Sequence, residues 1–253
     1  MTTPRSVLLE QLTWTEIESA LENDVTTALV PAGSVEQHGP HLGILKDAGW
    51  AEAIGMEVAR ELGNALVAPV IRPGCSDHHM GFAGTISYRP ETLMRVFEDY
   101  CYSLDEHGFE YIAVFSMHGG NFPALNAILP RLADELDAEL ITLLDKELLI
   151  EPLLESLEAF DIPETARGHG GAAVTASVLD LRPDLVDETE FVEGYTGDVS
   201  TSALTTHGLD EFTELGHMGD PTYATRELGE DVTGRLVAGF ADRIRSEQGD
   251  RHD

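Results

Sequence analysis

A chain of 253 residues with 42% hydrophobic side chains can form one large α/β domain, and we expect a single domain over residues 1–253. Its 46 acidic residues against 15 basic ones give a formal net charge of −31, which excludes nucleic acid and anionic membranes as expected partners. No apolar run reaches the roughly 18 residues of a membrane span. Two cysteines and no signal peptide predict a cytoplasmic protein.

Short apolar runs typical of β-strands alternate along the chain with longer segments of helical period. The expected strands cover residues 27–30, 66–71, 111–115 and 140–144. The expected helices cover residues 48–62, 91–106, 124–136, 146–158, 172–181 and 226–245. This alternation predicts an α/β fold, a three-layer sandwich in which helices flank a mostly parallel central sheet.

Proline and glycine punctuate this pattern. Gly63 and Gly108 stand where a helix ends and a left-handed backbone is needed. Pro152 predicts a break or kink in the 146–158 helix, because proline lacks the amide hydrogen that a helix uses. Residues 187–216 predict a long irregular loop, and such loops are often functional. We expect the tail at about 246–253 to be frayed.

The segment GSVEQHGPHLGILKD follows the first expected strand and carries the candidate ligands Glu36, His38, His41 and Asp47. Because ligands gather at the carboxyl ends of parallel strands, this loop lies where a site is expected. Imidazole and carboxylate side chains together suit zinc, manganese or iron, and an aspartate can bridge two ions. For His41 alone, a hydrogen bond within the loop is an equally good interpretation.

The segment SMHGGN follows another apolar strand, so His118 lies at the carboxyl end of a second strand. Its two glycines let the backbone pass close to an ion or a substrate. A phosphate-binding loop is disfavoured, because neither the P-loop lysine nor the spaced dinucleotide glycines are present.

Further histidines occur in two other segments. His78 and His79 follow the second expected strand with Asp77 and can line a pocket mouth, although adjacent histidines are more often hydrogen-bonded than metal-bound, an interpretation that we favour for His78. His169 stands in a glycine-rich turn before a helix. A histidine that exchanges protons near neutral pH can protonate the leaving nitrogen of an amide. Capping of the following helix is the alternative role for His169.

The order of these motifs resembles the creatininase family of amidohydrolases. The family patterns GSxEQHGPHL, a following Asp, FxGTIS, HGGN and HAGxxETS with an LxxxPxLV tail correspond here to GSVEQHGPHL, Asp47, FAGTIS, HGGN and HGGAAVTA with LDLRPDLV. The resemblance covers about residues 25–240 and includes GHMGDP. Several motifs in one order are far more specific than any one of them.

This resemblance implies one creatininase-like α/β sandwich domain, a homo-oligomer (a hexamer in the family) and a small-molecule amide substrate. It implies one or two divalent ions per chain, Zn, Mn or Fe. Glu36 and His118 are expected as metal ligands, His38 as a ligand of the other ion, and Asp47 as the bridge. The expected catalytic residues are Glu36 and His169, the latter as the acid-base residue. A hydroxide formed on the metal would attack the amide carbon.

Two departures from the family patterns fall in the site. An ungapped comparison places Val174 where the family has a glutamate and Ala176 where it has a serine. Loss of that carboxylate predicts a weak or absent second ion. The family's L-G-T-D is altered to L-K-D, which places Lys46 beside Asp47, where it either repels a cation or points outward.

Three functions follow from different classes of protein. The first is an active amidohydrolase on a small cyclic or linear amide. The second is a deformylase or peptide-trimming member of the same superfamily, and the third is a degenerate, non-catalytic protein with one metal ion or none. Creatinine is disfavoured as the substrate. By the family resemblance, creatinine hydrolases have an acidic residue at the position that Gly120 occupies here.

The charge of −31 predicts that stability depends on salt. Repulsion among surface carboxylates should weaken as the Debye length falls from about 10 Å at 0.1 M salt to about 3 Å at 1 M. We therefore expect the thermal midpoint to rise over this range in thermal melts at constant pH. An unchanged or falling midpoint would reject adaptation to high salt.

Overall fold

The computed structural model describes residues 4–197 and 199–249. Its central sheet has the strands β1 (Thr27–Ala32), β2 (Ala65–Val67), β3 (Tyr111–Ser116) and β4 (Glu139–Thr142). They lie in the order β2-β1-β3-β4, and every neighbouring pair is parallel. The parallel sheet is thus confirmed, and β1 is buried along its whole length, as expected of a strand covered on both faces.

All four strands differ in extent from the sequence prediction; β3 gains Ser116, and β4 spans Glu139–Thr142 in place of 140–144. β1 continues through Pro31, whose carbonyl accepts a hydrogen bond from the Ile71 amide on the β2 side. Because β2 has already ended at Val67, the missing proline N–H removes no bond from that ladder. β2 is shorter than the predicted 66–71, and the chain rejoins the sheet only through a single bridge between Ile71 and Ala32.

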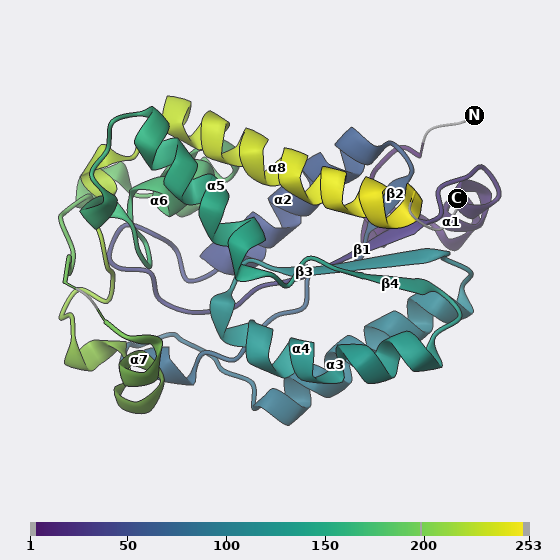
Figure 1. The fold of residues 1–253 in the computed structure, drawn as a ribbon, viewed down its shortest axis with the longest axis horizontal. Coiled ribbons are helices and arrows are strands. Elements are labelled where there is room, and N and C mark those ends of the chain that lie inside the picture. The colour runs from purple at the N-terminus through teal and green to yellow at the C-terminus, as the bar shows by residue number, and fades with distance from the viewer. Residues whose placement is uncertain (1–3, 198, 250–253) are drawn as a thin grey trace.

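Helices cover both faces of the sheet (Figure 1). The described helices are α1 (Trp14–Leu21), α2 (Lys46–Leu62), α3 (Pro90–Glu106), α4 (Phe122–Glu135), α5 (Lys146–Ala159), α6 (Ala172–Leu181), α7 (Thr201–His207) and α8 (Arg226–Gly249). α3 and α4 lie on one face, whereas α2 and α8 lie on the other with α5 and α6 beside them (Figure 1). The three-layer sandwich is confirmed.

Two of these helices were not predicted from the sequence. α1 begins with a capping box in which Thr13 and Glu16 each bind the other's backbone amide, a signal that the apolar periodicity of eight residues does not reveal. α7 lies inside the segment 187–216 that we expected to be irregular, where Ser200 caps its first turn. α5 runs unbroken across Pro152, contrary to the predicted break. α8 reaches Gly249, beyond the expected end at 245, and residues 250–253 lie outside the described part.

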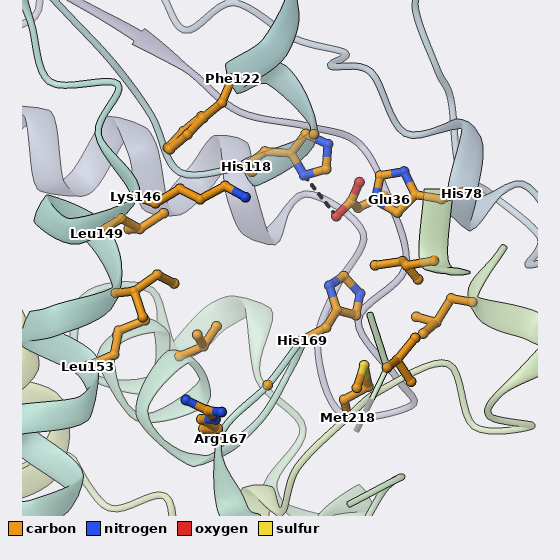
Figure 2. A pocket seen from close by; sticks show the side chains of 18 of the residues that line it. Glu36, His78, His118, Phe122, Lys146, Leu149, Leu153, Arg167, His169 and Met218 are labelled. Carbon is orange, nitrogen blue, oxygen red and sulfur yellow. Dashed lines mark ion pairs between the residues drawn. The ribbon is translucent and has the colours of Figure 1, made fainter. Parts of the chain in front are cut away.

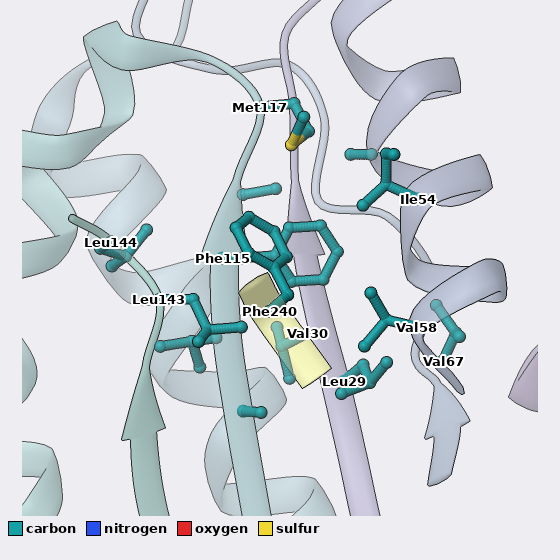
Figure 3. Close-up of a cluster of buried hydrophobic side chains, with 14 of the residues drawn as sticks. Leu29, Val30, Ile54, Val58, Val67, Phe115, Met117, Leu143, Leu144 and Phe240 are labelled. Atoms are coloured by element: carbon teal, nitrogen blue, oxygen red, sulfur yellow. The ribbon is translucent and has the colours of Figure 1, made fainter. Parts of the chain in front are cut away.

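One hydrophobic cluster extends from Leu8 to Ile244 and joins the sheet to α2 and α8. Figure 3 shows its centre, where the rings of Phe115 and Phe240 pack edge to face with their centroids 5.4 Å apart. This cluster fixes the strand ends from which the site loops leave. None of the helices in residues 4–197 and 199–249 combines the length and hydropathy of a bilayer span.

Replacing Phe240 with Ala should lower the free energy of unfolding by about 3–5 kcal/mol, because the side chain is 1% exposed and its loss leaves a cavity. Urea denaturation followed by circular dichroism measures this change. Phe160, which is 39% exposed, provides the matched control, and its replacement by Ala should cost far less. Equal losses in the two variants would contradict this placement of the core.

Candidate metal centre and active site

The site lies where the strand order reverses. β2 pairs on one side of β1 and β3 on the other, so the loops that follow β1 and β3 diverge at a topological switch point, the usual ligand site of an open parallel sheet. Glu36 follows β1, His118 follows β3, and Asp47 lies in the first turn of α2. The structure thus brings together the residues that the two sequence motifs supply.

Two buried carboxylates form the centre of this site. Glu36 and Asp47 are each 1% exposed. The Nδ1 atom of His118 lies 3.2 Å from Glu36 Oε1 and 3.3 Å from Asp47 Oδ2 (Figure 2 shows the Glu36 contact). The Nε2 atom of His38 lies 3.4 Å from Asp47 Oδ1 and 3.6 Å from Glu36 Oε1. The expected ligands Glu36, His38, Asp47 and His118 therefore converge.

Hydrogen bonds to the main chain fix which imidazole nitrogen faces the carboxylates. His118 Nε2 donates to the Cys75 carbonyl at 2.8 Å, and His38 Nδ1 donates to the Glu36 carbonyl at 3.2 Å. A carbonyl only accepts, so these two nitrogens each carry a proton. The opposite nitrogens face the carboxylates, where each can carry a proton in the metal-free protein or, once deprotonated, bind a metal ion.

His169 is held in the same manner. Its Nε2 atom donates to the Gln37 carbonyl at 2.7 Å. Its ring stacks on His38 with centroids 3.9 Å apart, and on His79 at 4.3 Å. Burial, together with the neighbouring His38 and His79, holds the pKa of His169 well below its usual range. His169 is therefore a neutral base with its Nδ1 lone pair free.

His79 belongs to the site, although sequence reasoning left its role open. The Gln37 side-chain oxygen accepts from the Gly39 amide at 3.0 Å, which turns the amide nitrogen of Gln37 toward His79 Nδ1 at 3.1 Å. His79 Nδ1 therefore accepts, and its Nε2 carries the proton toward Glu36 Oε1 at 3.4 Å. This tautomer turns the protonated nitrogen of His79, and not a lone pair, toward Glu36. The only sequence signal was its position after the second strand.

The charges in the cluster determine one another's pKa values. Burial alone would raise the pKa of Glu36, but His118 beside it holds that pKa below its usual range. Burial likewise opposes ionisation of Asp47, yet Lys46 and His38 keep its pKa well below the ordinary value. Burial would lower the pKa of His118, whereas Glu36 and Asp47 raise it to about 10. Both carboxylates are thus ionised and attract a cation.

The donor set fits a divalent metal ion. Among the described residues, two groups present three ligand atoms within 4.8 Å of one another: Glu36, Asp47 and His118, and Glu36, His79 and His169. Glu36 Oε2 is buried and has no hydrogen-bond partner, which a bound ion would remedy. Because His79 presents a proton to Glu36, the first group is the better metal site.

Other predicted residues occupy the surroundings of this centre. His41 is a structural residue, because its Nε2 donates to the Gly170 carbonyl at 2.9 Å and so holds the loop that carries His169. His78 lines the cavity, and it belongs to neither group of converging ligand atoms among the described residues. Val174 also lines it from α6 and is only partly buried, so its position faces the cavity. Lys46 points inward, which resolves the alternative that the sequence left open.

A large cavity opens beside the metal centre. Its volume is about 1540 Å³, beyond the roughly 300–1,000 Å³ of most small-molecule pockets. Figure 2 shows Phe122, Leu149 and Leu153 on its apolar side. The metal centre lies on the opposite side of the cavity (Figure 2). The cavity can therefore hold a substrate with an extended apolar portion next to Glu36 and His169.

Comparisons with known proteins agree with this arrangement. The family described as "Creatininase: Creatinine amidohydrolase" matches residues 10–244. A curated relative, the "Mycofactocin precursor peptide peptidase" of Mycolicibacterium smegmatis, is 33% identical over 94% of this chain and 92% of its own. The solved structure titled "Creatininase Mn" has a TM-score of 0.84 at 26% identity and covers 96% of this chain and 99% of its own. A mutant creatininase of "Zn-Zn type" has a TM-score of 0.81 at 27% identity, with coverage of 96% and 98%.

The pKa of His118 predicts a pH dependence of the metal-free protein. Because the pKa of His118 is raised in the folded state, its protonation stabilises the folded protein. This stabilisation is complete below pH 6.5, the ordinary pKa, and is lost as the pH rises through about 10. A bound ion takes the His118 lone pair and removes that titration. The difference in thermal midpoint between metal-loaded and chelated protein should therefore widen from pH 6.5 to 9.5. A midpoint difference that stays constant with pH would contradict the assignment of His118 as a metal ligand. So would a pH dependence that His118→Gln leaves unchanged.

Proposed function

The chain belongs to the creatininase family and is a hydrolytic enzyme, and from this premise we propose that it is a metal-dependent amidohydrolase. The observation that supports the proposal most strongly is the buried convergence of Glu36, Asp47 and His118, together with a Glu36 oxygen, Oε2, that has no hydrogen-bond partner. Its relatives are peptidases and amidohydrolases, which favours catalysis over the degenerate, non-catalytic alternative.

Glu36, Asp47 and His118 would hold the ion, and His38 lies beside them as a further donor. A bound divalent ion polarises a carbonyl and makes water a nucleophile at neutral pH. Zinc and manganese suit these ligands, and both occur in the titles of related structures. Glu36 would anchor the ion, with His79 Nε2 3.4 Å from its Oε1.

His169 supplies the proton transfer in this proposal. Its neutral imidazole can take a proton from the attacking water through Nδ1 and release it to the leaving nitrogen. The Gln37 carbonyl holds the ring in one tautomer throughout. The amide carbon then gains an oxygen and loses its nitrogen as an amine, which is the overall hydrolysis of a C–N bond.

We propose that the substrate is a peptide or peptide-like amide rather than a small cyclic one. The volume of the cavity and the 33% identity to a peptide peptidase support this choice. Creatinine hydrolases are expected to have an acidic residue at the position of Gly120. A Cβ atom at Gly120 would lie 2.3 Å from His118 Nε2, so this backbone leaves no room for such a side chain. A screen of peptides, formyl amides and cyclic amides at molar salt with added Zn²⁺ or Mn²⁺ tests the choice.

We further propose a cytoplasmic, salt-adapted homo-oligomer of one domain. The charge of −31 supports the adaptation to salt, and the buried free thiols of Cys75 and Cys101 fit a reducing compartment. The continuous hydrophobic cluster supports a single domain. The oligomer and the compartment remain predictions.

Replacing Glu36 with Gln and His169 with Asn should separate metal binding from proton transfer. Glu36→Gln should lose both bound metal and hydrolysis, because it removes a ligand charge. His169→Asn should keep the metal but lower kcat by about 10²–10⁴-fold. Metal analysis and steady-state kinetics measure the two effects, and His207→Asn, on exposed α7, is the control. Full activity of His169→Asn would remove this residue from the mechanism.

A further inference from the structure

We infer that the ammonium group of Lys46 occupies the place of a second metal ion, so that each chain binds one ion only. This inference rests on the proposed metal-dependent function and concerns the same site. It assigns to Lys46 a positioning role, as a fixed positive charge that holds Asp47.

Lys46 is buried, with 3% of its surface exposed. Its Nζ atom lies 2.6 Å from Asp47 Oδ1 and 4.5 Å from the centroid of the Trp50 ring. The Trp50 indole is fixed in turn, because its Nε1 donates to Ser177 Oγ at 2.9 Å. The ammonium group therefore has a carboxylate and an aromatic face as defined partners, both of which stabilise a positive charge.

This position is otherwise unfavourable for a lysine. Lys46 is the first residue of α2, where the positive end of the helix dipole disfavours a cation. The chain contains only two lysines, and the other, Lys146, begins α5 in the same way but is exposed. Because burial of a charged group is costly unless it is paired, the contact with Asp47 explains why Lys46 is tolerated here.

A second ion lacks both a free oxygen and a third ligand. Asp47 Oδ2 faces His118 and accepts a hydrogen bond from Ser34 at 2.7 Å, so that only Oδ1 faces His38. Lys46 already binds this oxygen. Among the described residues, His38 belongs to neither group of three converging ligand atoms. Val174 offers no oxygen where the family pattern has a carboxylate.

The charge balance also favours a single ion. With the histidines neutral, as metal binding requires, Glu36 and Asp47 carry two negative charges, and Lys46 reduces the net charge of the cluster to minus one. One divalent ion changes this to plus one, whereas a second ion would leave plus three in a buried site with neutral histidines. An excess of that size is strongly unfavourable away from water. With one ion and one lysine the cluster stays close to neutral.

Metal counting on the purified full chain tests this inference. Protein reconstituted with Mn²⁺ and freed of excess ion by gel filtration is analysed by elemental analysis and by electron paramagnetic resonance, which distinguishes isolated from spin-coupled Mn²⁺. The wild type and Val174→Glu should bind one ion, because the ammonium group remains. The double variant Lys46→Thr with Val174→Glu should bind two. Lys146→Thr is the matched lysine control and should bind one.

The outcomes separate this inference from the proposed function. No bound metal in the wild type would overturn the proposed function itself. Two ions per wild-type chain would overturn the role of Lys46 and leave the function intact. A folded double variant that still binds one ion would also contradict it. If the double variant does not fold, the ion count in the wild type, with anomalous diffraction at the Mn edge, decides the question.

Discussion

The rest of the site depends on two carboxylates that are held away from water at the end of a parallel sheet. Glu36 and Asp47 are almost fully buried and ionised, so every neighbouring group must supply positive charge or a hydrogen bond. Histidines and Lys46 provide the positive charge, and the hydroxyl of Ser34 donates a hydrogen bond to Asp47. One buried oxygen, Glu36 Oε2, has no hydrogen-bond partner among the described residues, in line with the proposed metal site.

The backbone arranges these partners as much as the side chains do. Carbonyls of Cys75, Glu36 and Gln37 each accept a proton from one imidazole, and they thereby choose the nitrogen that the ring presents to the site. Two of these carbonyls lie in the loop after β1 itself. The loop that supplies Glu36 therefore also orients His38 and His169, so a local shift of this loop would disturb ligands and base together.

Much of this arrangement could be predicted from the sequence, because it follows from strand ends and residue chemistry. The parallel strands, most helices and the convergence of Glu36, His38, Asp47 and His118 come from apolar periodicity and from motifs that follow strands. The inward direction of Lys46 could not be predicted, since it depends on a pairing within the first turn of α2. The tautomer of His79 depends on the orientation of the Gln37 amide, which only the three-dimensional hydrogen-bond network fixes.

The distribution of the two lysines has a practical consequence for labelling. Lys46 is enclosed beside Asp47, whereas Lys146 is exposed on the wall of the cavity (Figure 2). An amine-reactive fluorophore therefore meets a single accessible lysine side chain in the native protein. That attachment point lies on the cavity wall, so native lysine chemistry would place an optical reporter of occupancy there, without engineered cysteines.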